Sequence, residues 1–398
     1  MAQVSIIRHN PIAVFSNPVE VVVKDDRNQV FRMVEPSGNV GTQYPNDVGS
    51  EWFGTIENLK KGLDLCGVHW SDVYKTDVLW TTPSRDRDVC DKRKNDFNTI
   101  YGSMINAVTG GPLRSNRMAR FTHPEGFPDP RALFEVQIRA IRGAHVKIGG
   151  GKIDHGYWVD HQPSGASVMH KRGDETITTL GPDLAKETEF VLEEHYAKSF
   201  AEQGIDFRKQ TVWMEILVGV DDAPEKAWDR IEIVRRVFEK YFGEHRPAGL
   251  IYPVSRIPNL DGIVEPQPRV VSGDVEVIRS GYMEHGFSTW NAIRYGGVTE
   301  VMVSAVGGNE AGVILNTIDS RIKEAGGNGL KEDGIFNNAY IVTQNTSEAS
   351  RTWLKTFNAS FGAYYAGAAP SARTGQFMGG IQQKEFDCGV SNRSIFAR

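Results

Sequence analysis

This sequence has few cysteines, no excess of basic residues and no long apolar runs. Only three of its 398 residues are cysteines, and their odd number and wide spacing exclude a disulfide scaffold and indicate a reducing compartment. The 45 Lys and Arg residues do not outnumber the 50 Asp and Glu residues, which argues against a general nucleic-acid or anionic-membrane binder. No run is apolar enough to span a bilayer, and the first residues lack a signal-peptide pattern. We therefore expect a soluble, cytoplasmic protein with neither nucleic acid nor membrane as a partner.

Motifs for cofactors and metals are also missing. The sequence contains no G-x-G-x-x-G, and the run GGGK at 149–152 lacks the first glycine and the final Ser or Thr of a phosphate loop. One group of metal-ligand residue types lies in the second third of the chain: Asp154, His155, Asp160, His161 and His170. No helix-face spacing or Cys/His frame accompanies them, so we expect loop histidines, no metal and no cofactor.

What is present is a module that recurs three times, at intervals of about a third of the chain. It begins with a helix that stops at a glycine: Gly67, Gly204 and Gly326. A β-rich run follows at 73–82, 211–220 and 335–344, and then a second helix that ends near residues 101, 242 and 361. Apolar residues spaced by three and four predict the helices, and a glycine past the last turn is the expected left-handed cap.

This pattern predicts an α+β fold. Each module reads as strands, helix, strand, helix and strand, which gives a mixed sheet with two helices on one face. Gly- and Pro-rich joints at 143–152 and 264–274 divide the chain into units 1–148, 149–272 and 273–398. Burial of the remaining sheet faces favours three units around a pseudo-threefold axis.

At this level of detail the sequence resembles a known family. The first module, TIENLKKGLDLCGVHWSDVYKTDVLWTT, is similar to the central block of the Rid (YjgF/YER057c/UK114) family of imine and enamine deaminases. The third resembles it through EAGGNGLKEDGIFNNAYIVTQ and PSARTGQ, and the second matches only in pattern. The family consists of homotrimers of a chorismate-mutase-like fold with active sites between subunits. The resemblance thus implies a trimer fused into one chain, and it leaves further homo-oligomerisation open.

The resemblance also implies site residues. The family uses an arginine after the second helix to bind a substrate carboxylate and a glutamate on the last strand. These positions match Arg373 and Glu385 in the third module and Arg114 and Glu135 in the first. In the second module the matching stretch is Pro247-Ala248-Gly249, which lacks the arginine, and Glu265 is an uncertain match for the glutamate, so at most two such sites are implied. An ordinary ion pair between Arg373 and Glu385 is the alternative reading.

An Arg and Glu pair suits hydrolysis of a C=N bond. A guanidinium holds a carboxylate bidentately, and a carboxylate can move the protons of water and of the leaving nitrogen. The resemblance therefore predicts a deaminase for a small carboxylated enamine or imine, such as an aminomuconate-type intermediate of aromatic catabolism. Three alternatives stay open: a ring-amide hydrolase of the cyanuric acid hydrolase/barbiturase type, for which no recurrent Ser/Lys pair is found, a chorismatase-like hydrolase, and a non-catalytic metabolite-binding protein.

Overall fold

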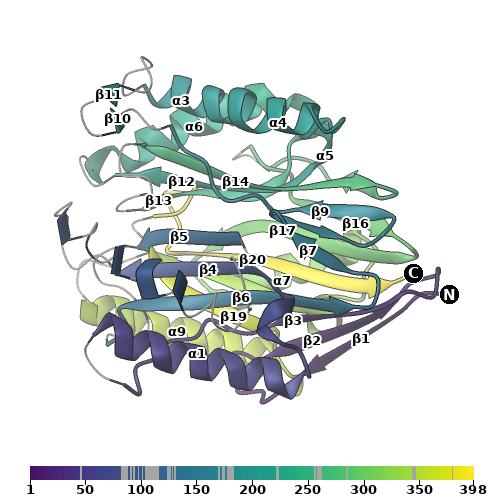
Figure 1. Cartoon of the computed structure of the whole chain (residues 1–398). Coiled ribbons are helices and arrows are strands. Elements are labelled where there is room, and N and C mark those ends of the chain that lie inside the picture. The colour runs from purple at the N-terminus through teal and green to yellow at the C-terminus, as the bar shows by residue number, and fades with distance from the viewer. Residues whose placement is uncertain are drawn as a thin grey trace.

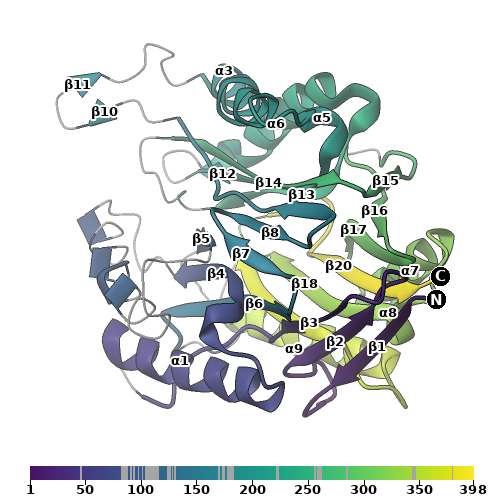
Figure 2. The same cartoon turned by 45° about the vertical axis from the view of Figure 1, so that its right-hand side comes forward.

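Three six-stranded mixed sheets form the centre of the computed structural model, and helices lie on the outside (Figure 1). Both termini lie at the same edge of the molecule (Figure 2). The structure describes residues 1–44, 47–81, 88–89, 92, 95–96, 98–100, 102–103, 116–122, 127, 129, 131–168, 171–172, 175–176, 183–220, 224–254, 257, 262–283, 286–342, 347–378 and 380–398. The predicted α+β class with mixed sheets is confirmed.

The three sheets share one strand order. Given as hydrogen-bonded neighbours, the first sheet is β1 (Gln3–Arg8), β2 (Val19–Lys24), β3 (Val30–Glu35), β6 (Phe134–Gly143), β4 (Val73–Thr81) and β5 (Asn116–Thr122). The second sheet is β7 (Lys147–Gly149), β8 (Lys152–Asp154), β9 (Trp158–His161), β14 (Val264–Gly273), β12 (Thr211–Gly219) and β13 (Ala248–Val254). The third sheet is β15 (Glu276–Arg279), β16 (Trp290–Tyr295), β17 (Val298–Gly308), β20 (Cys388–Ala397), β18 (Gly334–Val342) and β19 (Ala372–Met378).

The register repeats as well. In each sheet the strand after the first helix pairs in parallel with an edge strand and antiparallel with its other neighbour. The antiparallel ladder is interrupted by a shift at the same place each time: Val73/Lys75, Thr211/Trp213 and Gly334/Phe336. This common bulge lets every strand position in one sheet be matched to a position in the other two.

Helices begin and end where the sequence places caps. The carboxylate of Asp47 accepts the Ser50 N–H at 2.9 Å, and the first helix stops before Gly67, which has a φ of 62°. The other two predicted stops, Gly204 and Gly326, also have positive φ, 74° and 95°. The helices are α1 (Val48–Leu65), α3 (Leu184–Phe190), which continues through the π-helical turn Val191–Ala197 into α4 (Lys198–Ala201), α5 (Phe207–Gln210), α6 (Ala227–Phe242), α7 (Ala311–Glu324), α8 (Leu330–Asp333) and α9 (Ser347–Tyr364). A small hairpin pairs β10 (Lys171–Arg172) with β11 (Glu175–Thr176).

The two Gly- and Pro-rich stretches predicted as joints are not linkers along their whole length. The stretch 264–274 is not a linker, because Val264–Gly273 is the central strand β14. Pro266 and Pro268 are tolerated there since β9 pairs with β14 only from Val270 onward, so their missing N–H groups interrupt no ladder on that side. The run at 149–152 is the turn of the β7–β8 hairpin, with Gly150 and Gly151 at φ of 59° and 72°.

One strand per module escaped prediction. Two strands, and not one, follow the second helix, because the edge strands β5, β13 and β19 are separate elements. The sequence of β19, ARTGQFM, has few β-branched residues and gives a weak strand signal. The unit boundaries at 148 and 272 stay predictions, since strand pairing alone does not define folding units.

The helices of each sheet cover one face, and the other faces meet in the middle. A core cluster joins α3, α4 and α6 to the second sheet, and another joins α7 and α9 to the third. A further cluster takes side chains from all three sheets, including Val21, Trp158 and Tyr295. The rings of Trp158 and Tyr295 stack with their centres 4.4 Å apart. Among the described residues, no helix is long and apolar enough to cross a membrane.

Candidate functional site

The edge of the third sheet docks on the first sheet. The backbone N–H of Arg373 on β19 donates to Ser37 Oγ at 2.9 Å, and the Gly38 N–H donates to the Arg373 carbonyl at 3.2 Å. Asn39 then bridges to Val136 on β6. The segment after β3 therefore lies between β19 and β6, and it brings side chains of two sheets together. We call this place the third–first joint.

Arg373 is a nearly buried cation, 9% exposed. Its Nη1 donates to Asn358 Oδ1 on α9 at 2.9 Å, and the guanidinium lies 4.9 Å from the ring centre of Phe361. Within the described part of the chain no carboxylate lies within ion-pair distance of it. Burial lowers the pKa of Arg373 to about 10, although Glu135 acts in the opposite direction. The Arg373 guanidinium is thus a nearly buried positive charge that an anionic ligand would stabilise.

Glu135 on β6 supplies the carboxylate of this joint. It is buried, and a Cβ atom added to Gly38 would lie 1.8 Å from Glu135 Oε1 and 2.9 Å from Thr374 Oγ1. Because residue 38 is a glycine, the Glu135 carboxylate can occupy the space beside it, close to Thr374 on β19. Arg373 and Glu135 were assigned to different sites from the sequence, and the structure brings them together.

The placement of Glu385 on the last strand is wrong. Glu385 is an exposed residue of a turn, and β20 begins only at Cys388. The turn is held by the Gln383 side chain, which accepts the Gly307 N–H at 3.1 Å. Glu135 lies opposite Leu79 in β4, and the matching residue opposite Tyr340 in β18 is Gly389. Cys388 is fully buried in the core, as expected.

Arg114 lies outside the described residues. Strand register nevertheless identifies the position in the first sheet that matches Arg373. On β4 the next residue after Lys75, which follows the bulge, is Thr76, and Thr76 pairs with Arg117. On β18 the next residue after Phe336, which follows the bulge, is Asn337, and Asn337 pairs with Arg373. The counterpart of Arg373 in the first sheet is thus Arg117.

The equivalent joint between the second and third sheets carries neither charge. The Gly249 N–H donates to Ser304 Oγ at 2.8 Å, just as the Arg373 N–H donates to Ser37. By strand register Gly249 occupies the arginine position and Gly389 occupies the glutamate position. We call this the second–third joint.

The sequence analysis did not find Ser37 and Gly38. A signal was present, because the tripeptide Pro36-Ser37-Gly38 recurs as Pro163-Ser164-Gly165. A Cβ on Gly165 would lie 2.2 Å from Glu265 Oε1, which repeats the arrangement of Gly38 and Glu135. Asn358 and Thr374 had no comparable sequence signal.

Six charged residues, five of them buried and Arg139 partly exposed, alternate in sign in the middle of the molecule. Arg269 binds Asp160 at 2.9 Å and Glu300 at 3.1 Å, Arg393 binds both Glu300 and Glu35, and Arg139 lies 3.4 Å from Glu35. Burial opposes ionisation of Glu300, but Arg269 and Arg393 outweigh it and hold its pKa well below the usual range. We call these residues the charge chain, and it links all three sheets.

A cavity of about 50 Å³ lies beside the charge chain. Matching positions of the three sheets line it: Lys75, Trp213 and Phe336, and, two residues further along each strand, the polar residues Asp77, Glu215 and Asn338. A volume of this size holds a few water molecules and no larger metabolite.

His155 and His161, both named from the sequence, contact different protein partners. His155 is buried and stacks on Trp158 at 4.1 Å, and burial lowers its pKa to about 4. His161 lies 2.9 Å from Ser272 Oγ, and Asp160 belongs to the charge chain. His170 lies outside the described residues.

Comparisons with known proteins yield solved structures only. No family model and no curated protein matches the sequence. A crystal structure of chorismatase is 11% identical, with a TM-score of 0.46 over 81% of this chain and 93% of that one. E. coli TdcF with bound serine is 19% identical, with a TM-score of 0.23 over 28% of this chain and 80% of that one. A member of the YjgF/YER057c/UK114 family from Mycobacterium tuberculosis is 19% identical, with a TM-score of 0.19 over 27% and 77%. These are likenesses of fold, and the chemistry below is argued from the site.

Proposed function

We propose that this protein is a hydrolytic deaminase for a small carboxylated enamine or imine, and that it acts at the third–first joint. One observation carries the proposal. Among the described residues, the Arg373 guanidinium is nearly buried and donates only to a neutral amide, that of Asn358, and the buried carboxylate of Glu135, from another sheet, is close enough to influence its charge. Such a cation gains a full ion pair only when an anion enters the site.

Each side chain has one task in the reaction. Arg373 binds the substrate carboxylate and thereby fixes the neighbouring C=N bond. Glu135 accepts a proton from water as the water oxygen bonds to the iminium carbon, and it returns that proton to the nitrogen as the C–N bond breaks. The second proton of the water leaves the hydroxyl group as the carbonyl forms and is taken up by Glu135, so one iminium and one water give a keto acid, ammonia and one proton.

We further propose that the three sheets are three fused Rid-like units around a pseudo-threefold axis. The common strand order, the bulge at one shared position, and the mutual contacts of the edge strands β5, β13 and β19 support this arrangement. In such an arrangement each joint corresponds to one subunit interface of a homotrimer, and only some joints keep the charged residues.

The test is ammonia release from freshly generated imines and aminomuconates. Wild-type chain is expected to release ammonia from a carboxylated member of the panel, and Arg373→Ala to lose about 10- to 100-fold in kcat/KM, the effect of one charge-assisted contact. Arg236→Ala, which removes an exposed arginine of α6, is the matched control. Unchanged turnover in Arg373→Ala would sink the assignment.

The same panel separates the alternatives. Including chorismate and cyclic amides tests the chorismatase-like and ring-amide readings. Carboxylates that raise the melting temperature of wild type but not of Arg373→Ala, with no turnover of any compound, would indicate a binding protein instead.

A further inference from the structure

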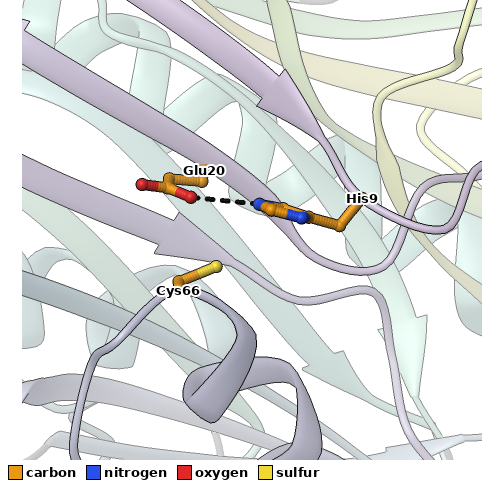
Figure 3. A group of neighbouring side chains, drawn as sticks. All are labelled: His9, Glu20 and Cys66. Atoms are coloured by element: carbon orange, nitrogen blue, oxygen red, sulfur yellow. Dashed lines mark hydrogen bonds and ion pairs between the residues drawn. The ribbon is translucent and has the colours of Figure 1, made fainter.

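Three side chains of the first sheet converge at one end of α1 (Figure 3). His9 directly follows β1, Glu20 lies on β2, and Cys66 caps the C-terminus of α1. His9 Nε2 lies 3.0 Å from Glu20 Oε2, and both atoms and Cys66 Sγ lie within 4.8 Å of one another. In a tetrahedral zinc site, bonds of 2.0–2.3 Å place neighbouring ligand atoms about 3.3–3.8 Å apart. Small movements of these side chains therefore suffice to enclose an ion.

The fold itself does not require this trio. The matching positions follow from strand register for Glu20 and from the helix-stop glycines for Cys66. The counterparts are Lys152 and Ala292 for Glu20, and Gln203 and Ala325 for Cys66. The second and third sheets are thus built without a carboxylate or a thiol at these two positions, so the common fold does not depend on them.

Charged groups surround the trio. The last turn of α1 has no basic residue of its own, but Arg32 Nη1 donates to the Cys66 carbonyl and Arg142 Nη1 donates to the Gly67 carbonyl at 2.7 Å, at the end of the helix that carries partial negative charge. Arg32 binds the other oxygen of Glu20, Oε1, at 2.9 Å and so orients the carboxylate with Oε2 toward His9.

We propose that His9 Nε2, Glu20 Oε2 and Cys66 Sγ bind one zinc ion, with a fourth position open to water. The mixed N, O and S set is the one that zinc accepts, and three protein ligands with one open position are typical of zinc sites that keep a water. The His9 side chain is 24% exposed and provides the entry path. Binding replaces the thiol proton by the metal, so one proton leaves for each zinc bound.

The experiment measures zinc and cobalt binding to the full, chelator-treated chain. Equilibrium dialysis is expected to give one zinc per wild-type chain, and cobalt is expected to show a thiolate-to-metal charge-transfer band. Cys66→Ser and His9→Gln are each expected to weaken binding by more than about 100-fold, beyond the loss seen for residues that only support a ligand. Cys388→Ser, which removes the buried thiol of the third sheet, is the matched control and is expected to bind as wild type does.

The outcomes are decisive in either direction. His9 is partly exposed, so His9→Gln is expected to fold, which circular dichroism checks. No zinc on the wild-type chain, or equal affinity in wild type and His9→Gln, would overturn the site. So would a cobalt band that survives in Cys66→Ser and disappears in Cys388→Ser.

Discussion

The third–first and second–third joints share the same backbone contacts but differ in their side chains, which are charged at the first joint and absent at the second. At both, an edge strand donates a backbone N–H to a serine of the next sheet, Ser37 or Ser304. The first of these joints carries Arg373 and Glu135, and the second carries Gly249 and Gly389. Docking of the sheets therefore does not depend on the charged pair. Since the pair is dispensable for the fold at one joint, its presence at the other points to a ligand.

Glu135→Gln is expected to have the largest effect on this comparison. Loss of the proton-transferring carboxylate lowers kcat by about 10²- to 10⁴-fold, with KM nearly unchanged, because Arg373 still binds the substrate. Steady-state ammonia release measures both constants. Glu385→Gln, at the exposed turn before β20, is the control and is expected to match wild type. The reverse ranking of the two variants would restore Glu385 as the catalytic carboxylate.

Gly249→Ala tests whether the second–third joint is purely structural. A Cβ there would lie 1.8 Å from the Met214 carbonyl oxygen, a backbone atom that cannot move aside cheaply. We expect a loss of about 1–3 kcal/mol in unfolding free energy and no change in turnover per folded molecule. Denaturant titration measures the first quantity. The control is Gly149→Ala, where an added Cβ has no neighbour within 4 Å. A fall in turnover of the folded Gly249→Ala protein would show that this joint also does chemistry.

Gly38→Ala and Gly165→Ala separate the two joints that keep a glutamate. Each added methyl would overlap a carboxylate oxygen, that of Glu135 or that of Glu265. A flexible side chain can move away, so stability is expected to change little, while displacement of Glu135 is expected to lower kcat/KM about tenfold in Gly38→Ala. Gly165→Ala is expected to turn over as wild type does. Equal losses in both variants would place activity at two joints.

The dependence on pH is the smallest expected effect. Arg373 is fully protonated well below its pKa of about 10, so substrate affinity is complete at neutral pH and falls as the pH rises through 10. At pH 10 half the guanidinium groups are neutral, and KM is expected to be about twofold higher than at pH 8. Arg373→Lys would keep a titrating cation there, whereas Arg373→Ala would abolish this pH dependence. A wild-type KM that stays constant to pH 11 would contradict the role of Arg373.

Local patterns predicted much of the fold. The runs at 73–82, 211–220 and 335–344 became β4, β12 and β18, and the glycine stops became left-handed caps. Strand β14 was missed because two prolines interrupt its pattern, and their tolerance depends on the missing neighbour β9 at that level. Edge strand β19 was missed because it has few β-branched residues.

The site was predicted in part. Arg373 and Glu135 were both named, but each was joined to a residue of its own module. Partner choice depends on which sheet edge docks on which neighbour, and no local period in the sequence encodes that. The trio at His9 gave no signal either, because its members come from two strands and a helix end that meet only in the folded chain.

The charge chain has a consequence for how the molecule unfolds. Asp160 and Arg269 belong to the second sheet, Glu300 and Arg393 to the third, and Glu35 and Arg139 to the first. Detachment of the third sheet would strip Arg269 of one of its two carboxylates and Glu35 of Arg393. A buried charge without its partner costs about 3–5 kcal/mol, so partly opened states are strongly disfavoured. The three sheets are therefore expected to melt in a single transition whose cooperativity is electrostatic in origin, and a chain cut between two sheets would expose unmatched charges at both cut faces.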